Sequence, residues 1–297
     1  MRMAFDQRQL RAFLAVAELG SLGRAVEIVH MSQPALSRLI QEMEIRLGSR
    51  LFDRLARGMM LTDFGEALVP YARKLLYEMD QAILALGAVR GLRTGMARVG
   101  AVATAARGLL PEAVEQMLRT APGLRVLLTE GETEQLLLEL NRYDLDLVIA
   151  GPAPASEAYE VVGECLIDSA LRVFCSAEHE LASKQDAGLE DVLAQSWVML
   201  PKGTDDRDYF DSKIQALGLP LPEVAVETNS ASTAISFVDR TRLLGWLPRP
   251  LFAGAERVGR FRVIDIPQLE RSERLYVYKR RHDDMRLAAK CLFDHIC

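Results

Sequence analysis

The chain has 297 residues, with 36 Lys+Arg against 41 Asp+Glu, a formal net charge of −5, and 49% hydrophobic residues. This composition is ordinary for a globular protein, and the length predicts two or three structural units. The acidic balance excludes a chain that is basic throughout. The lack of an apolar signal core at the start, or of any run long enough for a bilayer, predicts a cytoplasmic protein without a membrane segment.

The charge is unevenly distributed along the chain. Residues 1–93 hold 13 Lys+Arg and 10 Asp+Glu, which leaves 23 and 31 for the remainder. A mildly basic first part on an acidic body suits a DNA-binding module attached to something else. The difference in charge between the two parts is small, so the functional prediction depends on the sequence motifs.

A helix-turn-helix is predicted early in the chain. A first helix runs from about Asp6 to Leu19 and ends at Gly20. Two short helical patterns follow between residues 21 and 47, with Ser21 and Ser32 as their N-caps. Apolar side chains recur at helical spacing and are expected to face inward. In the two short helices these are Ala25, Val26, Ile28, Val29, Leu36, Leu39, Ile40, Met43 and Leu47.

The outer side of the second short helix is polar and weighted to its N-terminus. Gln33, Ser37 and Gln41 lie one above another, with Pro34 and Arg38 in the row beside them. Such a face is typical of a recognition helix in the major groove, where Gln pairs with adenine, Arg with guanine and Ser with a base or a phosphate. Taken alone, the pattern fits a solvent-exposed face of an ordinary helix pair equally well.

The surrounding sequence resembles the winged helix-turn-helix of the LysR-type transcriptional regulators. The matching segments are QLRAFLAVAELGS (9–21), MSQPALSRLIQEMEIRLG (31–48), RLFDR (50–54) and LTDFGEAL (61–68). Leu22 and Gly23 depart from the aromatic and the Thr that are usual in the family. The resemblance favours a DNA-reading face over an ordinary solvated one. The DNA contacts implied on this helix are Ser32, Gln33, Pro34, Ser37 and Arg38.

A hairpin and a long helix are predicted next. Residues 50–61 read as a β-hairpin wing with Arg54 and Arg57 at its tip, and the resemblance implies that both reach phosphate or the minor groove. A helix over about 63–90 then carries a nearly continuous apolar stripe that needs a partner. In the family this linker helix pairs two subunits, so a homodimer or homotetramer is expected. Glycines mark a hinge near 90–96.

From Ala97 the pattern alternates strand and helix. Strands are predicted at about 97–102, 124–129, 145–150, 161–167, 170–176, 197–200, 223–228, 243–247, 261–266 and 273–279, and helices near 107–120, 132–141, 188–195, 205–217, 230–240 and 283–297. Such alternation implies a parallel sheet with right-handed crossovers. Because this alternation occurs twice, two α/β subdomains are expected. The chain is expected to cross from the first subdomain to the second near 165–168 and to return to the first near 267–270.

This half resembles the periplasmic-binding-protein-like effector domain of the same family. The fold class expected is therefore an α/β multidomain protein with a winged helix-turn-helix, a long linker helix and an effector domain of two α/β subdomains. The expected boundaries are 1–62 for the DNA-binding domain, 63–96 for the linker helix and hinge, and 97–297 for the effector domain. Within the last, subdomain I takes about 97–166 and 268–297, and subdomain II about 167–267.

A ligand in an open α/β sheet binds outside the carboxyl ends of the strands, so a cleft is expected between the subdomains. The candidate effector contacts follow strands or precede helices: Thr104, Thr129, Gly151, Gly203, Thr204 and Ser230. Helix N-termini attract anions, and Lys202, Arg240 and Arg242 are nearby in sequence, so a small organic anion or polar metabolite is expected. Taken singly, each Ser or Thr fits a plain helix cap better; their shared position is the argument.

The resemblance implies double-stranded operator DNA, a small effector and RNA polymerase as partners, with no cofactor. Two rival functions were weighed. An enzyme would need a motif such as GxSxG, HExxH, a P-loop or GxGxxG, and none is present. A ligand-transport protein would leave residues 1–93 unexplained. Some relatives in the family sense peroxide, but nothing around Cys165 or Cys175 indicates a lowered thiol pKa.

Overall fold

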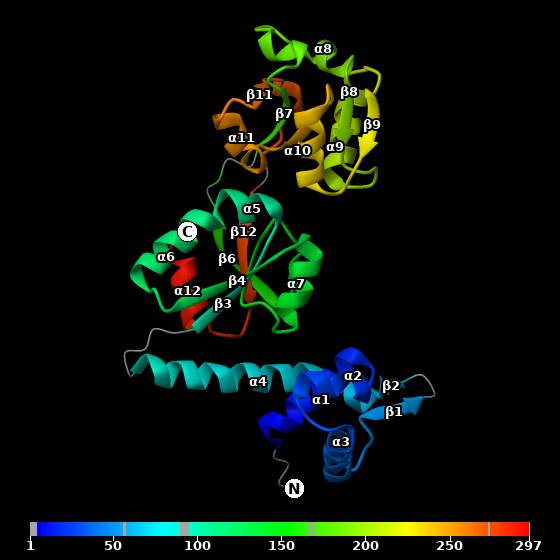
Figure 1. Cartoon of the computed structure of the whole chain (residues 1–297), viewed down its shortest axis with the longest axis vertical. Coiled ribbons are helices and arrows are strands. Elements are labelled where there is room, and N and C mark those ends of the chain that lie inside the picture. The colour runs from blue at the N-terminus through cyan, green and yellow to red at the C-terminus, as the bar shows by residue number, and fades with distance from the viewer. Residues whose placement is uncertain are drawn as a thin grey trace.

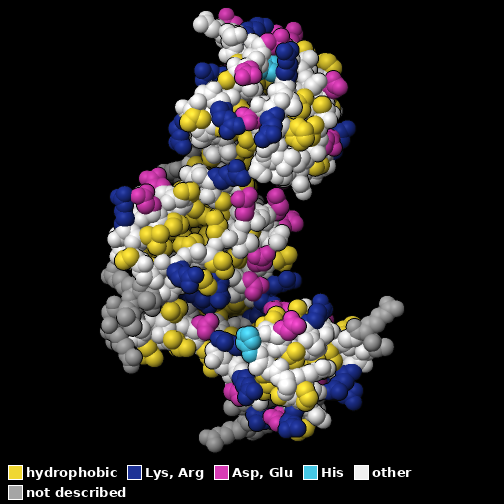
Figure 2. Space-filling view, viewed as in Figure 1, with side chains coloured by type: hydrophobic (Ala, Val, Ile, Leu, Met, Phe, Trp, Pro, Cys, Tyr) yellow, Lys and Arg dark blue, Asp and Glu magenta, His cyan; other side chains and the backbone are white. Residues whose placement is uncertain are grey.

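The computed structural model describes residues 5–55, 58–89, 95–165, 167, 170–272 and 274–296. Three bodies follow one another along the long axis (Figure 1): a helical head, and two α/β bodies that we call subdomain I, in the middle, and subdomain II. The outline narrows between the bodies (Figure 2). Within the described residues, none of the helices combines the length and apolar character that crossing a membrane requires.

The head packs three helices and a hairpin around one apolar core. Its elements are α1 (Gln7–Leu19), α2 (Leu22–Val29), α3 (Gln33–Leu47), β1 (Phe52–Leu55) and β2 (Gly58–Leu61). Phe13, Leu36 and Met43 are fully buried, as their helical spacing predicts. Ile28 was expected to face inward and is instead 59% exposed, because its neighbours on α2 already fill the arc that meets α1 and α3.

Helix α4 (Asp63–Val89) leaves the head and lies across the end of subdomain I (Figure 1). Thr62 caps it, accepting a hydrogen bond from the Gly65 backbone N–H at 3.2 Å. Gly65 is required there, because a Cβ would overlap the Leu51 carbonyl oxygen. Helix α4 also leaves a row of large apolar side chains exposed: Tyr71, Leu75, Met79, Ile83 and Leu86.

Subdomain I is a five-stranded sheet covered by helices. Its strand order is β4-β3-β5-β12-β6, in which β3 runs parallel to β4 and β5 while β12 is antiparallel to β5 and β6. The elements are β3 (Gly95–Ala101), α5 (Ala103–Gly108), α6 (Leu110–Thr120), β4 (Leu124–Glu130), α7 (Thr133–Asn141), β5 (Leu147–Ala150), β6 (Tyr159–Cys165), β12 (Leu275–Arg280) and α12 (Leu287–Phe293).

Two helices of this body differ from the sequence prediction. The single helix expected over 107–120 is two, because α5 starts directly after β3 and breaks at Leu109 before α6. Pro111 in the first turn of α6 removes no bond there but cannot continue α5. The last helix is shorter than 283–297, because residues 281–286 form turns before α12 begins.

Subdomain II is a second five-stranded sheet with the order β11-β7-β10-β8-β9. Its strands are β7 (Leu171–Ser176), β8 (Ser196–Met199), β9 (Glu223–Glu227), β10 (Leu244–Pro248) and β11 (Phe261–Ile264), and its helices are η1 (Glu180–Ser183), α8 (Leu189–Leu193), α9 (Asp205–Ala216), α10 (Ala231–Arg240), η2 (Arg249–Leu251), α11 (Ala253–Arg257) and η3 (Pro267–Leu269). Trp197, Phe210 and Trp246 fill one side of the sheet. Leu269 packs in that core, and Arg271 forms an isolated β-bridge with Leu171. The chain therefore returns to subdomain I slightly later than the expected 267–270.

The two subdomains touch at the carboxyl ends of their strands. Helix α5, which follows β3, packs against η2, which follows β10. Ala103 joins the apolar cluster around Phe174 of subdomain II. A Cβ on Gly108 would overlap the side chains of Ile167 and Pro250, so this glycine permits the close approach.

Candidate DNA-binding face and effector cleft

The outer face of α3 is available to a partner. Ser32, Gln33, Pro34 and Arg38 are exposed and Ser37 is half-buried. The opposite face is anchored by Leu36, Ile40 and Met43, all buried, so the rotation of the helix is fixed by its core contacts. The sequence-predicted polar row therefore points outward as a set.

Within the described part of the chain, the N-terminus of α3 lacks a side-chain cap from its N-cap residue. Ser32 occupies the N-cap position with an extended backbone, but its hydroxyl makes no capping hydrogen bond, contrary to the expectation for this residue. Pro34 lies in the first turn and contributes no N–H. The remaining N–H groups and the positive end of the helix dipole suit a phosphate, while the hydroxyl adds a further polar contact.

The wing touches the recognition helix directly. Arg54 of β1 donates from Nη2 to Ser37 Oγ at 3.3 Å, so the two predicted DNA contacts also bond to each other. β1 and β2 pair in the predicted hairpin, with Leu55 opposite Gly58. Arg57 lies outside the described residues. The Arg54–Ser37 bond joins residues 17 apart, which no helical or strand period reveals.

Three effector candidates of subdomain I gather at one sheet edge. Gly100 pairs with Thr129 and Ala101 with Ile149, so Thr129, Gly151 and the residues after β3 share the carboxyl edge. Thr104 was expected to precede its helix, but it lies inside α5. The residue is 9% exposed, and its hydroxyl bonds to no described residue. The hydroxyl oxygen is not among the fully buried polar atoms that lack a partner, so it keeps some contact with solvent and is available to a ligand beside the subdomain contact.

The three candidates of subdomain II share the corresponding edge. Met199 of β8 pairs with Glu227 of β9, and Gly203, Thr204 and Ser230 follow these strands. The Thr204 hydroxyl donates to the Pro201 carbonyl oxygen at 2.9 Å, rather than capping α9. Ser230 does cap α10, accepting from the Thr233 N–H at 3.3 Å. Its hydroxyl is thus partly engaged by an ordinary cap.

The charges at this edge differ from the sequence expectation. The first turn of α9 carries Asp205, Asp206 and Asp208, and Asp208 accepts from the Gly203 N–H at 3.1 Å. The positive helix end is therefore already met by carboxylates of the chain, which weakens its pull on an external anion. Arg271 pairs with Asp206 at 2.9 Å and offsets part of this negative charge.

The expected placement of Arg240 and Arg242 beside the cleft is wrong. Both lie at the C-terminal end of α10, whereas Ser230 caps its N-terminus. They line two hollows of about 420 and 440 Å³ that lie on either side of Phe237 and Thr241. None of the six candidate effector residues lines either hollow. Proximity in sequence misled here, because a ten-residue helix separates its two ends by about 15 Å.

The described cysteines give no support to redox sensing. Cys165 and Cys175 are buried within strands, and burial raises the pKa of the Cys175 thiol to about 11. A thiol with so high a pKa stays protonated at neutral pH and is a poor nucleophile. Among the described residues, no group of three or more His, Cys, Asp or Glu side chains is arranged to hold a metal ion.

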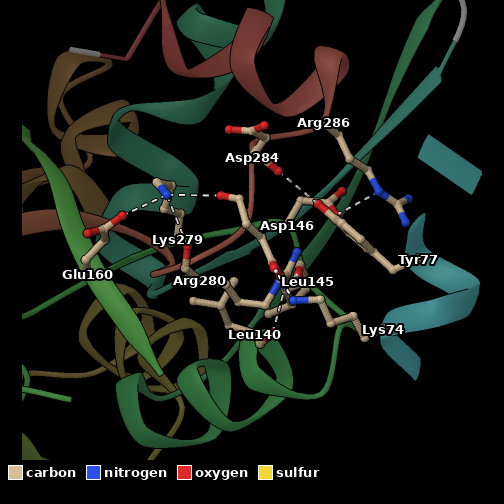
Figure 3. Close-up of polar contacts among 11 residues, drawn as sticks. Lys74, Tyr77, Leu140, Leu145, Asp146, Glu160, Lys279, Arg280, Asp284 and Arg286 are labelled. Carbon is tan, nitrogen blue, oxygen red and sulfur yellow. Dashed lines mark hydrogen bonds and ion pairs between the residues drawn. The ribbon is translucent and has the colours of Figure 1, made fainter. Parts of the chain in front are cut away.

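Sequence reasoning missed the contact between α4 and subdomain I (Figure 3). Tyr77 of α4 is 4% exposed and lies against Tyr143, with a ring-centroid distance of 5.2 Å. Arg280 faces both rings. Tyr143 has a positive φ of 64°, a backbone conformation that favours glycine, and no periodicity in the sequence indicated it.

Comparison with known proteins assigns both halves. Residues 7–66 match the family described as bacterial regulatory helix-turn-helix protein, lysR family, and residues 90–296 match the LysR substrate binding domain. The chain is 32% identical to the uncharacterized HTH-type transcriptional regulator YdcI of Escherichia coli K12 over 225 residues, 76% of this chain and 73% of the relative.

Solved structures agree on the fold. Full-length OxyR from Pseudomonas aeruginosa superimposes with a TM-score of 0.70 at 23% identity, covering 99% of this chain and 95% of that one. Full-length CbnR in complex with its target DNA gives a TM-score of 0.66 at 21% identity, covering 98% and 99%. These likenesses extend over the head, the linker helix and both subdomains.

Proposed function

The chain belongs to the LysR family of DNA-binding transcriptional regulators, and from this premise we propose that α3 and the wing read a two-fold-related operator under the control of a small polar effector bound between subdomains I and II. It is a regulator with an effector-binding domain and not an enzyme. The proposal concerns which residues perform these tasks. The observation that carries it is the exposed polar face of α3, held outward by a buried apolar face.

The DNA-reading assignment rests on chemistry at the groove. Gln33 and Arg38 are exposed on α3 and offer the pairings that distinguish adenine and guanine in the major groove. Ser32, Pro34 and Ser37 flank them, and Arg54 and Arg57 of the wing complete the proposed contacts. Full-length CbnR is seen with its target DNA, which supports an equivalent use of the same fold here.

Pairing of two heads follows from the exposed stripe on α4. Ile83 and Leu86 are 64% and 67% exposed, and with Tyr71, Leu75 and Met79 they form one apolar row. Covering such a row with the same row of a second copy removes it from water. We therefore assign residues 1–62 to DNA binding, 63–96 to linkage and 97–297 to effector binding, in a homodimer or homotetramer. RNA polymerase is the further partner expected, in the cytoplasm where the operator lies.

The effector assignment uses the two facing sheet edges. Thr104, Thr129 and Gly151 share the edge of subdomain I, and Gly203, Thr204 and Ser230 share that of subdomain II. The Thr104 hydroxyl, which bonds to no described residue, is the strongest of these proposed contacts. The aspartates at α9 favour a polar metabolite over a strongly anionic one at that end.

One experiment tests the regulator as a whole. The full-length protein is used to select bound fragments from random-sequence DNA, and the selected fragments are footprinted. We expect enrichment of two related half-sites about a whole number of helical turns apart. Recovery of single half-sites only would contradict the paired heads, and recovery of no shared sequence would contradict base reading by α3. A thermal-shift screen of metabolites then searches for the effector.

A further inference from the structure

Helix α4 docks on subdomain I through a compact set of charged and aromatic side chains that lies outside both candidate sites (Figure 3). We call this set the latch. From α4 it takes Arg73, Lys74 and Tyr77, and from subdomain I it takes Tyr143, Arg280, Asp283 and Arg286. These residues are up to about 200 positions apart in sequence, so only the fold brings them together.

Tyr77 is the centre of the latch. The guanidinium carbons of Arg280 and Arg286 lie 4.6 and 4.3 Å from its ring centroid. Its hydroxyl donates to the Asp284 carbonyl oxygen at 3.4 Å. Because Tyr77 is almost fully buried, these cation–π contacts are shielded from water and count for more than exposed ones.

Subdomain I builds the receiving surface by itself. Arg280 Nε bonds to Asp283 Oδ2 at 2.8 Å, and its Nη1 donates to the carbonyl oxygens of Leu140, at 2.8 Å, and Leu145. Lys74 Nζ then adds a bond to the free oxygen of Asp283 at 3.1 Å. That hydrogen bond raises the pKa of Lys74, so the amine stays charged where it docks.

Arg73 connects the latch to the DNA-binding head. Its Nη2 bonds to Glu18 Oε1 of α1 at 2.7 Å, and its Nη1 bonds to Asp144 Oδ1 of subdomain I at 2.8 Å. The same Nη1 reaches the Arg142 carbonyl oxygen at 3.1 Å. One side chain of α4, 13% exposed, therefore bonds to the head on one side and to the effector domain on the other.

Tyr143 adopts a costly conformation in order to take part. A left-handed backbone is unfavourable for a non-glycine residue. Its ring lies 5.2 Å from that of Tyr77 and 4.4 Å from the Arg280 guanidinium, which offsets the cost. Tyr77 belongs to none of the apolar clusters of the described residues, so the head and subdomain I keep separate cores. The docking is polar and aromatic, so opening it would expose the buried Tyr77 ring but neither of the two cores.

We propose that the latch residues are positioning residues for operator recognition, because they fix the angle between each head and its own effector subdomain and so set the half-site spacing that the protein accepts. This rests on the proposed function, since spacing exists only for paired heads. The docked arrangement leaves α3 turned away from subdomain I (Figure 1), so the latch does not block DNA. Its role is geometric.

The latch also lies at the edge of the sheet opposite to the one that carries the candidate effector contacts. β5 and β12 pair antiparallel, with Tyr276 opposite Ala150 and Tyr278 opposite Val148. β5 ends at that edge beside Gly151, whereas β12 ends in the latch at Arg280. A rearrangement at the cleft thus reaches the docking surface through two hydrogen-bonded strands.

The first measurement asks whether the latch docks the head in solution. Hydrogen exchange of α4 amides is followed in the full-length protein without DNA. Tyr143→Gly removes the ring and relieves the backbone, and Tyr77→Leu removes the other ring while keeping a helix former. We expect about tenfold faster exchange in both. Tyr77→Phe keeps the ring, so the α4 amides of this variant should exchange as slowly as those of the wild type. Arg142→Ala changes an exposed residue in the same turn as Tyr143 and is the matched control.

The second measurement asks whether docking sets spacing. Affinities are compared for a selected operator and for the same operator with half a helical turn inserted between its half-sites. We expect the penalty for the insertion to fall about tenfold in Tyr143→Gly and Tyr77→Leu, with affinity for the parent operator unchanged and with Tyr77→Phe and Arg142→Ala behaving as wild type. Unchanged α4 exchange, or altered exchange with an unaltered spacing penalty, overturns the proposal. If wild-type protein selects no paired half-sites, the proposed function fails and the spacing role with it, while the exchange data still report docking.

Discussion

The proposed DNA-reading face and the proposed effector site are built in opposite ways. Five of the proposed DNA contacts lie at the N-cap and in the first two turns of α3, and their direction follows from the buried row behind them. The six proposed effector contacts come from five separate segments between residues 104 and 230 and lie at the carboxyl edges of two different sheets. A face on one helix is set by local period, whereas the chemistry of a cleft depends on which side chains the fold brings next to one another.

This contrast predicts that the head is sensitive where its parts approach closely. Gly65→Ala places a Cβ against the Leu51 carbonyl oxygen at the start of α4. We expect the head to lose about 3 kcal/mol of unfolding free energy, although Gly→Ala normally favours a helix, because the backbone must shift to relieve the overlap. Denaturant unfolding followed through head amides measures it. An unchanged midpoint would mean that the wing and α4 are not in contact as described.

The next effect concerns base reading. Arg38→Ala removes an exposed guanidinium from the recognition face without touching the core of the head. We expect a loss of about 1–3 kcal/mol on the selected operator and relaxed preference at one base position. Competition binding against single-base variants measures both. Arg119→Ala, an exposed arginine on α6, serves as control, and a uniform loss across all sequences would reassign Arg38 to a phosphate.

The elements that sequence predicted correctly share a local cause. The α3 face, the wing and each strand of both sheets lie where periodicity and caps placed them. What sequence could not give depends on distant partners. Arg240 and Arg242 were assigned to the wrong end of α10, and the Asp208 bond to the Gly203 N–H was not foreseen. Tyr77 and Tyr143 differ by 66 positions, and no period relates a linker-helix residue to a turn in another body.

Substitutions at the proposed effector site are expected to have smaller effects than those in the head. The Thr104 hydroxyl bonds to no described residue, whereas that of Thr204 already donates to Pro201. Thr104→Val should weaken binding of the effector found by screening by about 1 kcal/mol, since one hydrogen bond is lost. Thr204→Val should weaken it less, and Thr120→Val on α6 should not change it. DNA binding without effector should stay intact in all three.

Calorimetry decides between these placements. Normal effector binding by both Thr104→Val and Thr204→Val would put the ligand elsewhere in the molecule. The hollows beside Phe237 are the next sites to examine in that case, through Phe237→Ala. A loss in Thr204→Val greater than in Thr104→Val would show that the helix end of subdomain II, not α5, dominates recognition.

The smallest expected effect is again on the stability of the head, and its sign is opposite to that of Gly65→Ala. Gly23 lies in the first turn of α2, and a Cβ there would meet nothing closer than the Ser21 hydroxyl at 3.7 Å. Gly23→Ala should therefore add about 0.5–1 kcal/mol to the stability of the head, because the unfolded chain loses conformational freedom and no neighbour is displaced. The same Gly→Ala change is thus stabilising at position 23 and destabilising at position 65, and only tertiary contact distinguishes the two sites.

Thermal unfolding of both variants beside wild type tests the pair. Operator affinity should not change in Gly23→Ala, since the substitution leaves the α3 face untouched. A lowered melting temperature in that variant would mean that α2 needs its glycine for a contact absent from the free chain.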